Sequence, residues 1–200
     1  ASTSTPNIYD VTYTIPASAG CPSENVTTNV TITELPTATL SYAGPFCSSQ
    51  GVQAPTLNGT ANYTGGTYTA GAGLSIDATT GEIDPSASTP DVYTVTYTIP
   101  ASGGCAAVPV QTSVTITEGP TATISYNDPF CDNLGGSQAV TLNGTGNYLG
   151  GTYSSTPAGL TLDVNNGNID ASTSTPNIYD VTYTIPASAG CPDSDVMTTV

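Results

Sequence analysis

The stretch YTVTYTIP at 93–100 decides the fold class of this chain. Tyr93, Val95, Tyr97 and Ile99 alternate with threonines, and a proline ends the run. In a β-strand successive side chains point to opposite faces, so alternation with a period of two indicates one buried face and one wet face. The stretch is therefore predicted to be a core strand of a β-sheet.

Nearly the same segment occurs three times along the chain. YDVTYTIPASAGC stands at 9–21 and again, unchanged, at 179–191, and YTVTYTIPASGGC at 93–105 differs from it at two positions. TATLSYAGPFC (37–47) likewise returns as TATISYNDPFC (121–131). A period of about 85 residues is the size of a small domain rather than of a solenoid turn. The chain is thus predicted to consist of tandem domains.

The repeat positions predict three units. Residues 36–119 form a complete repeat, and residues 120–200 form a second one that lacks the end of its last strand. Residues 1–35 correspond to the C-terminal strands of a preceding repeat, and 35 residues are too few to bury a core of their own. Because residues 1–21 are identical to 171–191, a two-domain unit has been duplicated, and the sequence is expected to be part of a longer array.

Short strands and turns recur inside each repeat. Beyond 93–99, strands are predicted at 37–42, 55–57, 66–69 and 74–76 and around Val114 and Ile116, with tight turns at Thr80-Gly81 and Asn166-Gly167. About seven short strands with frequent turn signals are typical of an immunoglobulin-like sandwich. Trp is absent, so the antibody-type Cys…Trp…Cys core is not present. The predicted fold class is all-β, with tandem Ig-like β-sandwich domains of about 85 residues.

Composition excludes several functions. The chain has 15 acidic residues and no Lys, Arg or His. Nothing in it can neutralise a phosphate backbone, so no nucleic-acid partner is expected. No apolar run approaches the roughly 20 residues of a membrane-spanning helix, so no membrane insertion is expected. A histidine-based triad and a Schiff-base lysine are impossible, and the chain is not expected to be an enzyme or to have catalytic residues.

Three phrases resemble a known group of repeats. SYxxPFC, GLSIDATTGEIDPSASTPDVYTVTYTIPASGGC and SVTITEGPTATISY are similar to the tandem Ig-like or PKD-like repeats of giant cell-surface adhesins of Bacteroidota. These include the SprB-type gliding-motility adhesins, which are cargo of the type IX secretion system. The resemblance covers essentially the whole chain and implies an extracellular location on a bacterial surface.

Five cysteines, two per repeat, favour disulfides and an oxidising compartment. Pairing within each repeat gives Cys47–Cys105 and Cys131–Cys191, and leaves Cys21 to pair outside the present sequence. Pairing across boundaries gives Cys21–Cys47 and Cys105–Cys131. The first scheme is preferred, although a strict Ig topology puts Cys47 and Cys105 at opposite ends of the domain. In that case Cys47 faces a neighbouring domain, and an interdomain disulfide becomes possible.

Calcium is the one cofactor with candidate ligands. Asp77 and Asp84, and their counterparts Asp163 and Asp170, bracket the turns DATTGEID and DVNNGNID. Oxygen ligands on a loop suit Ca²⁺, but the spacing departs from the EF-hand pattern. The competing interpretation is that these residues are there because Asp and Asn favour turns.

The leading hypothesis is structural. The chain is predicted to be a shaft segment of a large repetitive extracellular adhesin or surface filament, which bears force and presents a distal binding region. Its partners are then neighbouring repeats, while extracellular surfaces or glycans are bound by a region outside this sequence. The alternatives are a subunit of a pilus-like filament assembled by strand donation, glycan- or surface-binding repeats, and spacer repeats of a secreted enzyme.

Overall fold

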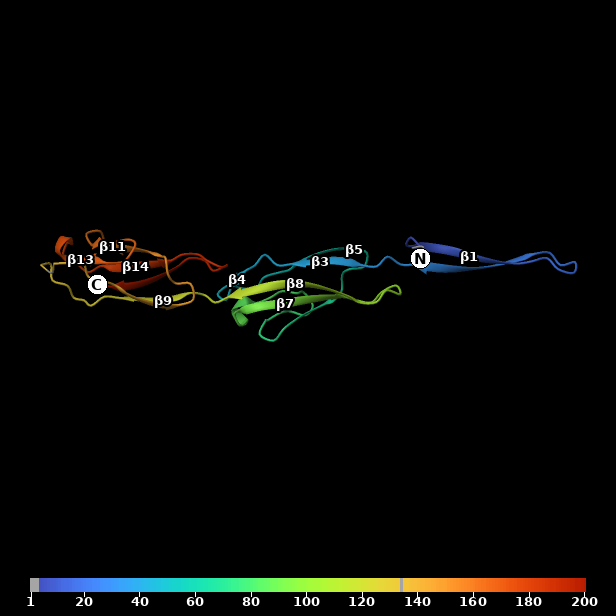
Figure 1. Cartoon of the computed structure of the whole chain (residues 1–200), viewed down its shortest axis with the longest axis horizontal. Helices are drawn as coiled ribbons and strands as arrows, with labels where there is room; N and C mark the ends of the chain where they lie inside the picture. The colour runs from blue at the N-terminus through green and yellow to red at the C-terminus, as the bar shows by residue number, and fades with distance from the viewer. Residues whose placement is uncertain (1–3, 134) are drawn as a thin grey trace.

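The computed structural model describes residues 4–133 and 135–200. Figure 1 shows these residues as an extended row of three units, a hairpin followed by two repeats. Apart from two short 3-10 turns, η1 (Pro85–Ala87) and η2 (Ala171–Thr173), the elements are β-strands. In the described part of the chain, no helix has the length and apolar character needed to cross a membrane.

The first unit is a single antiparallel hairpin. It consists of β1 (Asn7–Ile15) and β2 (Glu24–Ile32), which pair along their whole length from Asn7 opposite Ile32 to Ile15 opposite Glu24. The threonines and β-branched residues of both strands suit a pleated surface. An isolated two-stranded hairpin has no second layer against which to bury its apolar face, and the side chains of this hairpin are almost all exposed.

The repeat 36–119 is a sandwich of two sheets. One sheet has the order β4-β8-β7-β6, from β4 (Phe46–Cys47), β8 (Val108–Thr117), β7 (Asp91–Ile99) and β6 (Thr67–Ala70). The other pairs β3 (Thr37–Ser41) with β5 (Thr56–Thr60). All pairs are antiparallel except β4 with β8, which is parallel. The prediction of an all-β fold built from Ig-like sandwiches is confirmed.

The repeat 120–200 has the same plan. Its larger sheet has the order β11-β14-β15, from β11 (Thr152–Thr156), β14 (Asp180–Ile185) and β15 (Ser194–Thr199). β9 (Thr121–Ser125) pairs with β10 (Thr141–Thr145), and β12 (Thr161–Leu162) pairs with β13 (Ile169–Asp170). Each repeat has its own apolar core, one around Tyr97 and Ile83 and the other around Tyr183 and Ile169.

A buried tyrosine anchors each core. Tyr97 packs on Tyr68 with ring centroids 4.6 Å apart. Its hydroxyl donates to the carbonyl of Tyr63 (2.8 Å) and accepts from the N–H of Gly66 (2.9 Å). A buried phenol needs such partners because an unpaired polar group in a core is costly.

Two details of the strand prediction differ from the structure. Residues 74–76 form no strand and contribute only an isolated bridge between Ile76 and Ile83. In contrast, β4 was not predicted, because two residues are too short to show any periodicity. β4 exists because Phe46 is buried in the core while its backbone pairs with Ile116 of β8.

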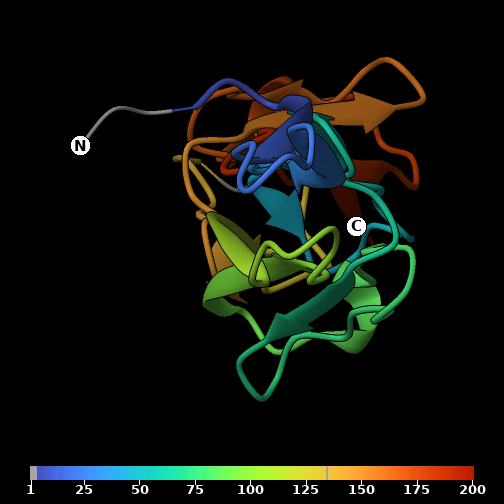
Figure 2. The ribbon, with the colours of Figure 1, turned by 90° about the vertical axis from the view of Figure 1, so that its right-hand side faces the viewer.

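The three units share one polarity. In each of them the turn between the last two strands points toward the end of the row where β1 and β2 lie, on the right in Figure 1. Seen along the row, the green part of the repeat 36–119 is displaced to one side of the hairpin (Figure 2). As a result, the hairpin turn of each repeat reaches the unit that precedes it.

Candidate functional site: the junction between repeats

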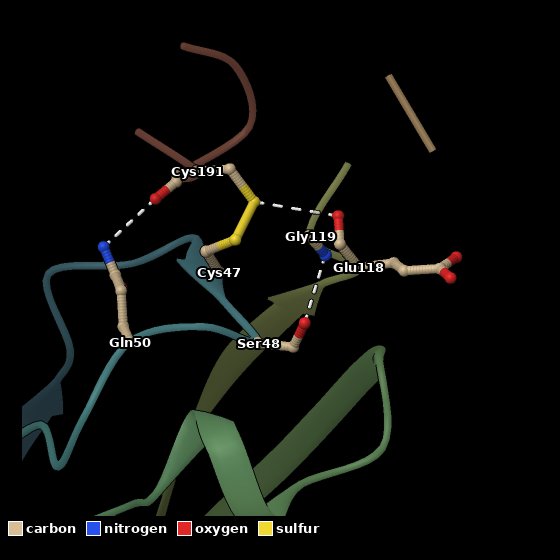
Figure 3. The surroundings of a disulfide bond; sticks show 7 residues. Cys47, Ser48, Gln50, Glu118, Gly119 and Cys191 are labelled. Carbon is tan, nitrogen blue, oxygen red and sulfur yellow. Dashed lines mark hydrogen bonds between the residues drawn. A yellow bond between two sulfur atoms is a disulfide. The ribbon is translucent and has the colours of Figure 1, made fainter. Parts of the chain in front are cut away.

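A disulfide joins the two repeats. Cys47 in β4 is bonded to Cys191, with an S–S distance of 2.06 Å and a Cα–Cα distance of 4.6 Å, although 144 residues separate them in sequence. Both residues are buried. Figure 3 shows the bond between the short strand of one repeat and the hairpin turn of the next. The junction is therefore covalent at a second point besides the main chain.

Local structure brings each cysteine to this place. Parallel pairing of β4 with the end of β8 sets Cys47 opposite Thr117, directly before the linker to the next repeat. Cys191 closes the turn after β14, where it exchanges backbone hydrogen bonds with Ser188 (3.0 and 2.8 Å). Ala189 and Gly190 in this turn have positive φ angles of 49° and 85°. Such a tight turn carries the sulfur at the tip of the hairpin.

The two repeats meet closely around the bond. Gln50 donates from Nε2 to the carbonyl of Gly190 across the junction (3.1 Å), and within the first repeat the N–H of Gly119 donates to the Ser48 hydroxyl (3.0 Å), as Figure 3 shows. A Cβ at position 190 would lie 2.2 Å from the carbonyl oxygen of Pro45. Only glycine fits there, because its positive φ and its missing side chain both allow the approach.

The junction between residues 1–35 and the repeat 36–119 has the same arrangement without the bond. The Thr33 hydroxyl donates to the carbonyl of Gly103 in the turn after β7. Cys105 Sγ lies 3.7 Å from the carbonyl oxygen of Glu34, and Cys191 Sγ lies 3.7 Å from that of Glu118. The Cys105 thiol can donate a weak hydrogen bond, whereas the sulfur of Cys191 has no proton, so its approach is a contact only. Cys105 thus occupies the place that Cys191 occupies one repeat later.

The predicted pairs Cys47–Cys105 and Cys131–Cys191 are wrong. Cys47 lies beside the last residues of β8, while Cys105 precedes its first residue. At about 3.3 Å per residue, a strand of this length separates the two cysteines by roughly 30 Å, far beyond disulfide reach. The cross-boundary pairs Cys21–Cys47 and Cys105–Cys131 are not formed either. Cys21, Cys105 and Cys131 carry free thiols in the described structure, and the pairing of Cys21 outside this sequence stays a prediction.

The candidate calcium ligands hold turns. Asp77 accepts from the N–H groups of Thr79 (2.7 Å) and Thr80 (2.8 Å), and these bonds hold the pKa of its carboxyl below the usual value. Asp163 accepts in the same way from Asn165 (2.8 Å) and Asn166 (3.3 Å). The carboxylate oxygens thus act as turn acceptors.

Asp84 and Asp170 cap the 3-10 turns η1 and η2. Asp84 accepts from the Ser86 hydroxyl (2.6 Å) and N–H (3.0 Å), and Asp170 accepts from those of Ser172 (2.7 and 3.0 Å). These hydrogen bonds lower the pKa of both carboxyls, and the bond from the serine hydroxyl has the largest effect. Within residues 4–133 and 135–200, no three Asp, Glu, Cys or His side chains gather as metal ligands.

A cavity of about 400 Å³ opens at the far end of the second repeat. Phe130, Ile169, Tyr179 and Val200 contribute to its apolar walls. In the first repeat, Ile116 of β8 is buried between the neighbouring strands and pairs with Phe46 and Asp91. In the second repeat, Val200 exchanges backbone hydrogen bonds with Tyr179 (2.9 and 2.8 Å) beside this cavity.

Comparisons with known proteins show no relative by sequence. No protein-family profile and no curated protein matches the chain. Among solved structures, the chain is similar to the EC1–4 fragment of Drosophila N-cadherin, with 12% identity, a TM-score of 0.44 and 90% of this chain covered. It is also similar to a SusE-like surface-located polysaccharide-binding protein from the heparin utilisation locus of Bacteroides thetaiotaomicron, with 12% identity, a TM-score of 0.30 and 86% covered. The chain spans 52% of the first structure and 35% of the second.

Proposed function

We propose that this chain is a segment of the shaft of a large extracellular surface protein, in which successive Ig-like repeats are locked in line to bear force. The observation that carries the proposal is the Cys47–Cys191 bond across a repeat junction. A disulfide inside a domain would stabilise that domain, whereas one between domains restricts how the two move relative to each other. Such a restriction is useful in a protein that must hold its shape over a distance.

The short linker supports the same function. β8 ends at Thr117 and β9 begins at Thr121. The residues between them are held by the hydrogen bond from Gly119 to Ser48. A long flexible linker would let the repeats rotate freely, but here the linker, the hydrogen bonds and the disulfide all fix the junction. The repeats therefore act as one stiff rod.

A disulfide favours an oxidising location outside the cytoplasm. The net charge of the chain is −15. Mutual repulsion of acidic repeats keeps neighbouring shafts apart. The finer proposal, a shaft of a bacterial adhesin of the SprB gliding-motility type exported by the type IX system, is supported by the phrases quoted above. It assigns no catalytic step and no cofactor to these residues, and places the binding of surfaces or glycans elsewhere in the protein.

The experiment that tests the proposal is mechanical shearing of intact cells of the source organism. An antibody against this chain should detect the protein in the sheared fraction, and a denaturing, reducing gel should show a band far larger than the 20.0 kDa of these residues. Protein that stays inside sheared cells would refute the surface location. A sheared band near 20.0 kDa would refute the single-chain shaft and favour a filament of separate subunits.

A further inference from the structure

The hairpin β1–β2 exposes an apolar face, whereas the equivalent face of β7 and of β14 is buried in its repeat. Residues 9–15 and 179–185 have the same sequence. Tyr13 is 67% exposed and Ile15 is 42% exposed, whereas their counterparts Tyr183 and Ile185 are each 1% exposed. Residues of β9 to β13 belong to the same core cluster as Tyr183 and Ile185, whereas β1 pairs with β2 in a separate two-stranded sheet.

The structure itself shows what fits this face. The core cluster that contains Tyr183 and Ile185 includes Ile124, Leu142 and Tyr153 of the repeat body 120–170. Because residues 1–21 repeat 171–191 without a change, a body of the same sequence would find the same surface on β1. A body placed directly before residue 1 would also be joined to it as residue 170 is joined to residue 171.

A free thiol stands at the matching position of the adjacent junction. Cys105 has the same turn, the same neighbouring carbonyl and the same 3.7 Å contact as the disulfide-bonded Cys191. Cys131 is the counterpart of Cys47 in the second repeat, and it is exposed and free. The structure therefore contains one completed bond and three halves of the same kind of bond, at Cys21, Cys105 and Cys131.

We propose that the exposed face of β1–β2 and the Cys105 thiol together form an acceptor site for a repeat body of the 120–170 type that precedes residue 1 in the same polypeptide. The Phe-Cys cysteine of that body, the counterpart of Cys47 and Cys131, bonds to Cys105. The inference rests on the proposed shaft function and extends it from one covalent junction to every junction. A second, separate copy is disfavoured as the occupant because two chains of net charge −15 repel each other.

The bond forms by thiol–disulfide exchange. The thiolate of one cysteine attacks a small-molecule disulfide such as oxidised glutathione, which releases one reduced thiol and leaves a mixed disulfide. The second cysteine then attacks the mixed disulfide and releases the other thiol. Two protein thiols are oxidised to one disulfide, and one glutathione disulfide is reduced to two thiols, so atoms and electrons balance.

Bonds at every junction would interlock. A continuous path of covalent bonds would reach Cys105 through its disulfide and follow the main chain of β8 and β9 to Cys131. The disulfide of Cys131 would then connect this path to a later repeat. The bond between Cys47 and Cys191 already closes a loop around that same segment. At most about 3.6 Å per residue, 26 residues reach roughly 90 Å, whereas two unfolded repeats would reach roughly 600 Å. The shaft could then not lengthen by full unfolding of its repeats.

The test uses an extended chain in which residues 36–170 are placed before residues 1–200. It is refolded with oxidised and reduced glutathione, digested with pepsin because the chain has no Lys or Arg, and its disulfides are mapped. We expect Cys131 of the added block to be bonded to the Cys105 of the original 200 residues, and Cys47 of the added block to be bonded to Cys21. Backbone amides at 9–15 should gain the hydrogen-exchange protection of those at 179–185.

The variant Cys105→Ser in the extended chain is the matched control. It should leave the added Cys131 as a free thiol while the Cys21 bond and the protection of residues 9–15 persist. If the Cys105 of the original 200 residues stays reactive toward maleimide in the oxidised extended chain although residues 9–15 are protected, the covalent part of the proposal is overturned. If residues 9–15 stay unprotected, the packing part is overturned as well.

The unextended 200-residue chain, oxidised under the same conditions, tests the choice of occupant. It should remain monomeric with Cys105 and Cys131 free. Dimers linked through Cys105 and Cys131 would show that separate copies assemble end to end, and would overturn the same-polypeptide occupant. These outcomes are independent of the shearing experiment, which concerns where the protein is located.

Discussion

Cys47 and Cys191 are bonded across a repeat boundary, while Cys47 and Cys105 of one repeat lie at opposite ends of β8. The parallel strand β4 lies at the exit end of its repeat, and the turn between the last two strands lies at the entry end of the next. Any array with this topology and these two cysteines per repeat brings an exit cysteine to an entry cysteine. The disulfide is thus a property of the junction rather than of the domain.

Loss of the junction bond should loosen the pair of repeats. Cys47→Ser removes a cross-link between positions 144 residues apart, which in the chain-entropy model is worth on the order of 4 to 5 kcal/mol of unfolding free energy. Urea titration should show a drop of up to this size, and small-angle X-ray scattering should show a broader distribution of lengths. Cys131→Ser removes a free thiol and should change neither measurement; an equal loss there would contradict this assignment.

Removing one buried hydroxyl should destabilise the second repeat. The Tyr183 hydroxyl donates to the carbonyl of Tyr148 (2.8 Å) and accepts from the N–H of Gly151 (2.9 Å). Tyr183→Phe leaves both backbone groups unpaired, at a cost of about 1 to 3 kcal/mol. Tyr13→Phe makes the same change in the same local sequence on an exposed strand, and should stay within about 0.5 kcal/mol. Chemical denaturation of both variants checks the contrast, and similar losses would refute it.

Two glycines with similar positive φ angles should respond differently to alanine. Gly65 and Gly81 have φ angles of 77° and 75°. A Cβ at position 65 meets nothing within 4 Å, whereas one at position 81 would lie 2.6 Å from the ring of Tyr68. Gly65→Ala should cost only the left-handed backbone penalty of about 1 to 2 kcal/mol. Gly81→Ala should cost clearly more in melting experiments, and equal costs would show that Tyr68 moves away freely.

Alkaline pH should destabilise both repeats through buried tyrosines. The Tyr42 hydroxyl donates to the carbonyl of Gly81 (2.6 Å), and burial, followed by the effect of Tyr68, raises the pKa of Tyr42 well above its ordinary value of 10.0. Tyr126 has the same arrangement with Gly167, and burial raises its pKa likewise.

A raised pKa means that the folded state holds the proton more tightly than the unfolded state. The stabilisation of the folded state by the protonated Tyr42 and Tyr126 is therefore complete below pH 10.0 and is lost as pH rises above this value. The melting temperature should fall along this range, with tyrosinate absorbance appearing together with unfolding. The double variant Tyr42→Phe, Tyr126→Phe should show a shallower fall. An unchanged slope would assign the effect to other groups.

Calcium removal should leave stability unchanged. The carboxylates of Asp77 and Asp84 already accept hydrogen bonds from their own turns. Melting curves with EDTA and with millimolar Ca²⁺, at matched ionic strength, should coincide. Magnesium at the same concentration is the control for general screening of the acidic surface. A rise in melting temperature with Ca²⁺ alone, absent in Asp77→Asn, would instead establish a calcium site.

The sequence by itself determined the repeat, the strand class and the core. The alternation of Tyr93, Val95, Tyr97 and Ile99 is a local property, because strand geometry alone assigns each side chain to a face. Buried positions in β7 and β14 follow from it directly. The turn function of Asp77 was likewise open to sequence reasoning, since the N–H groups that donate to its carboxylate lie two and three residues away.

Tertiary structure alone decided the site. Tyr13 is exposed and Tyr183 is buried although their local sequences are the same, because burial depends on strands from other parts of a repeat. The partner of Cys47 depends on which end of the sandwich β4 occupies, and a two-residue parallel strand has no periodicity from which to read that. A disulfide is fixed by the distance between two chain segments in space, and that distance is set by the packing of whole repeats.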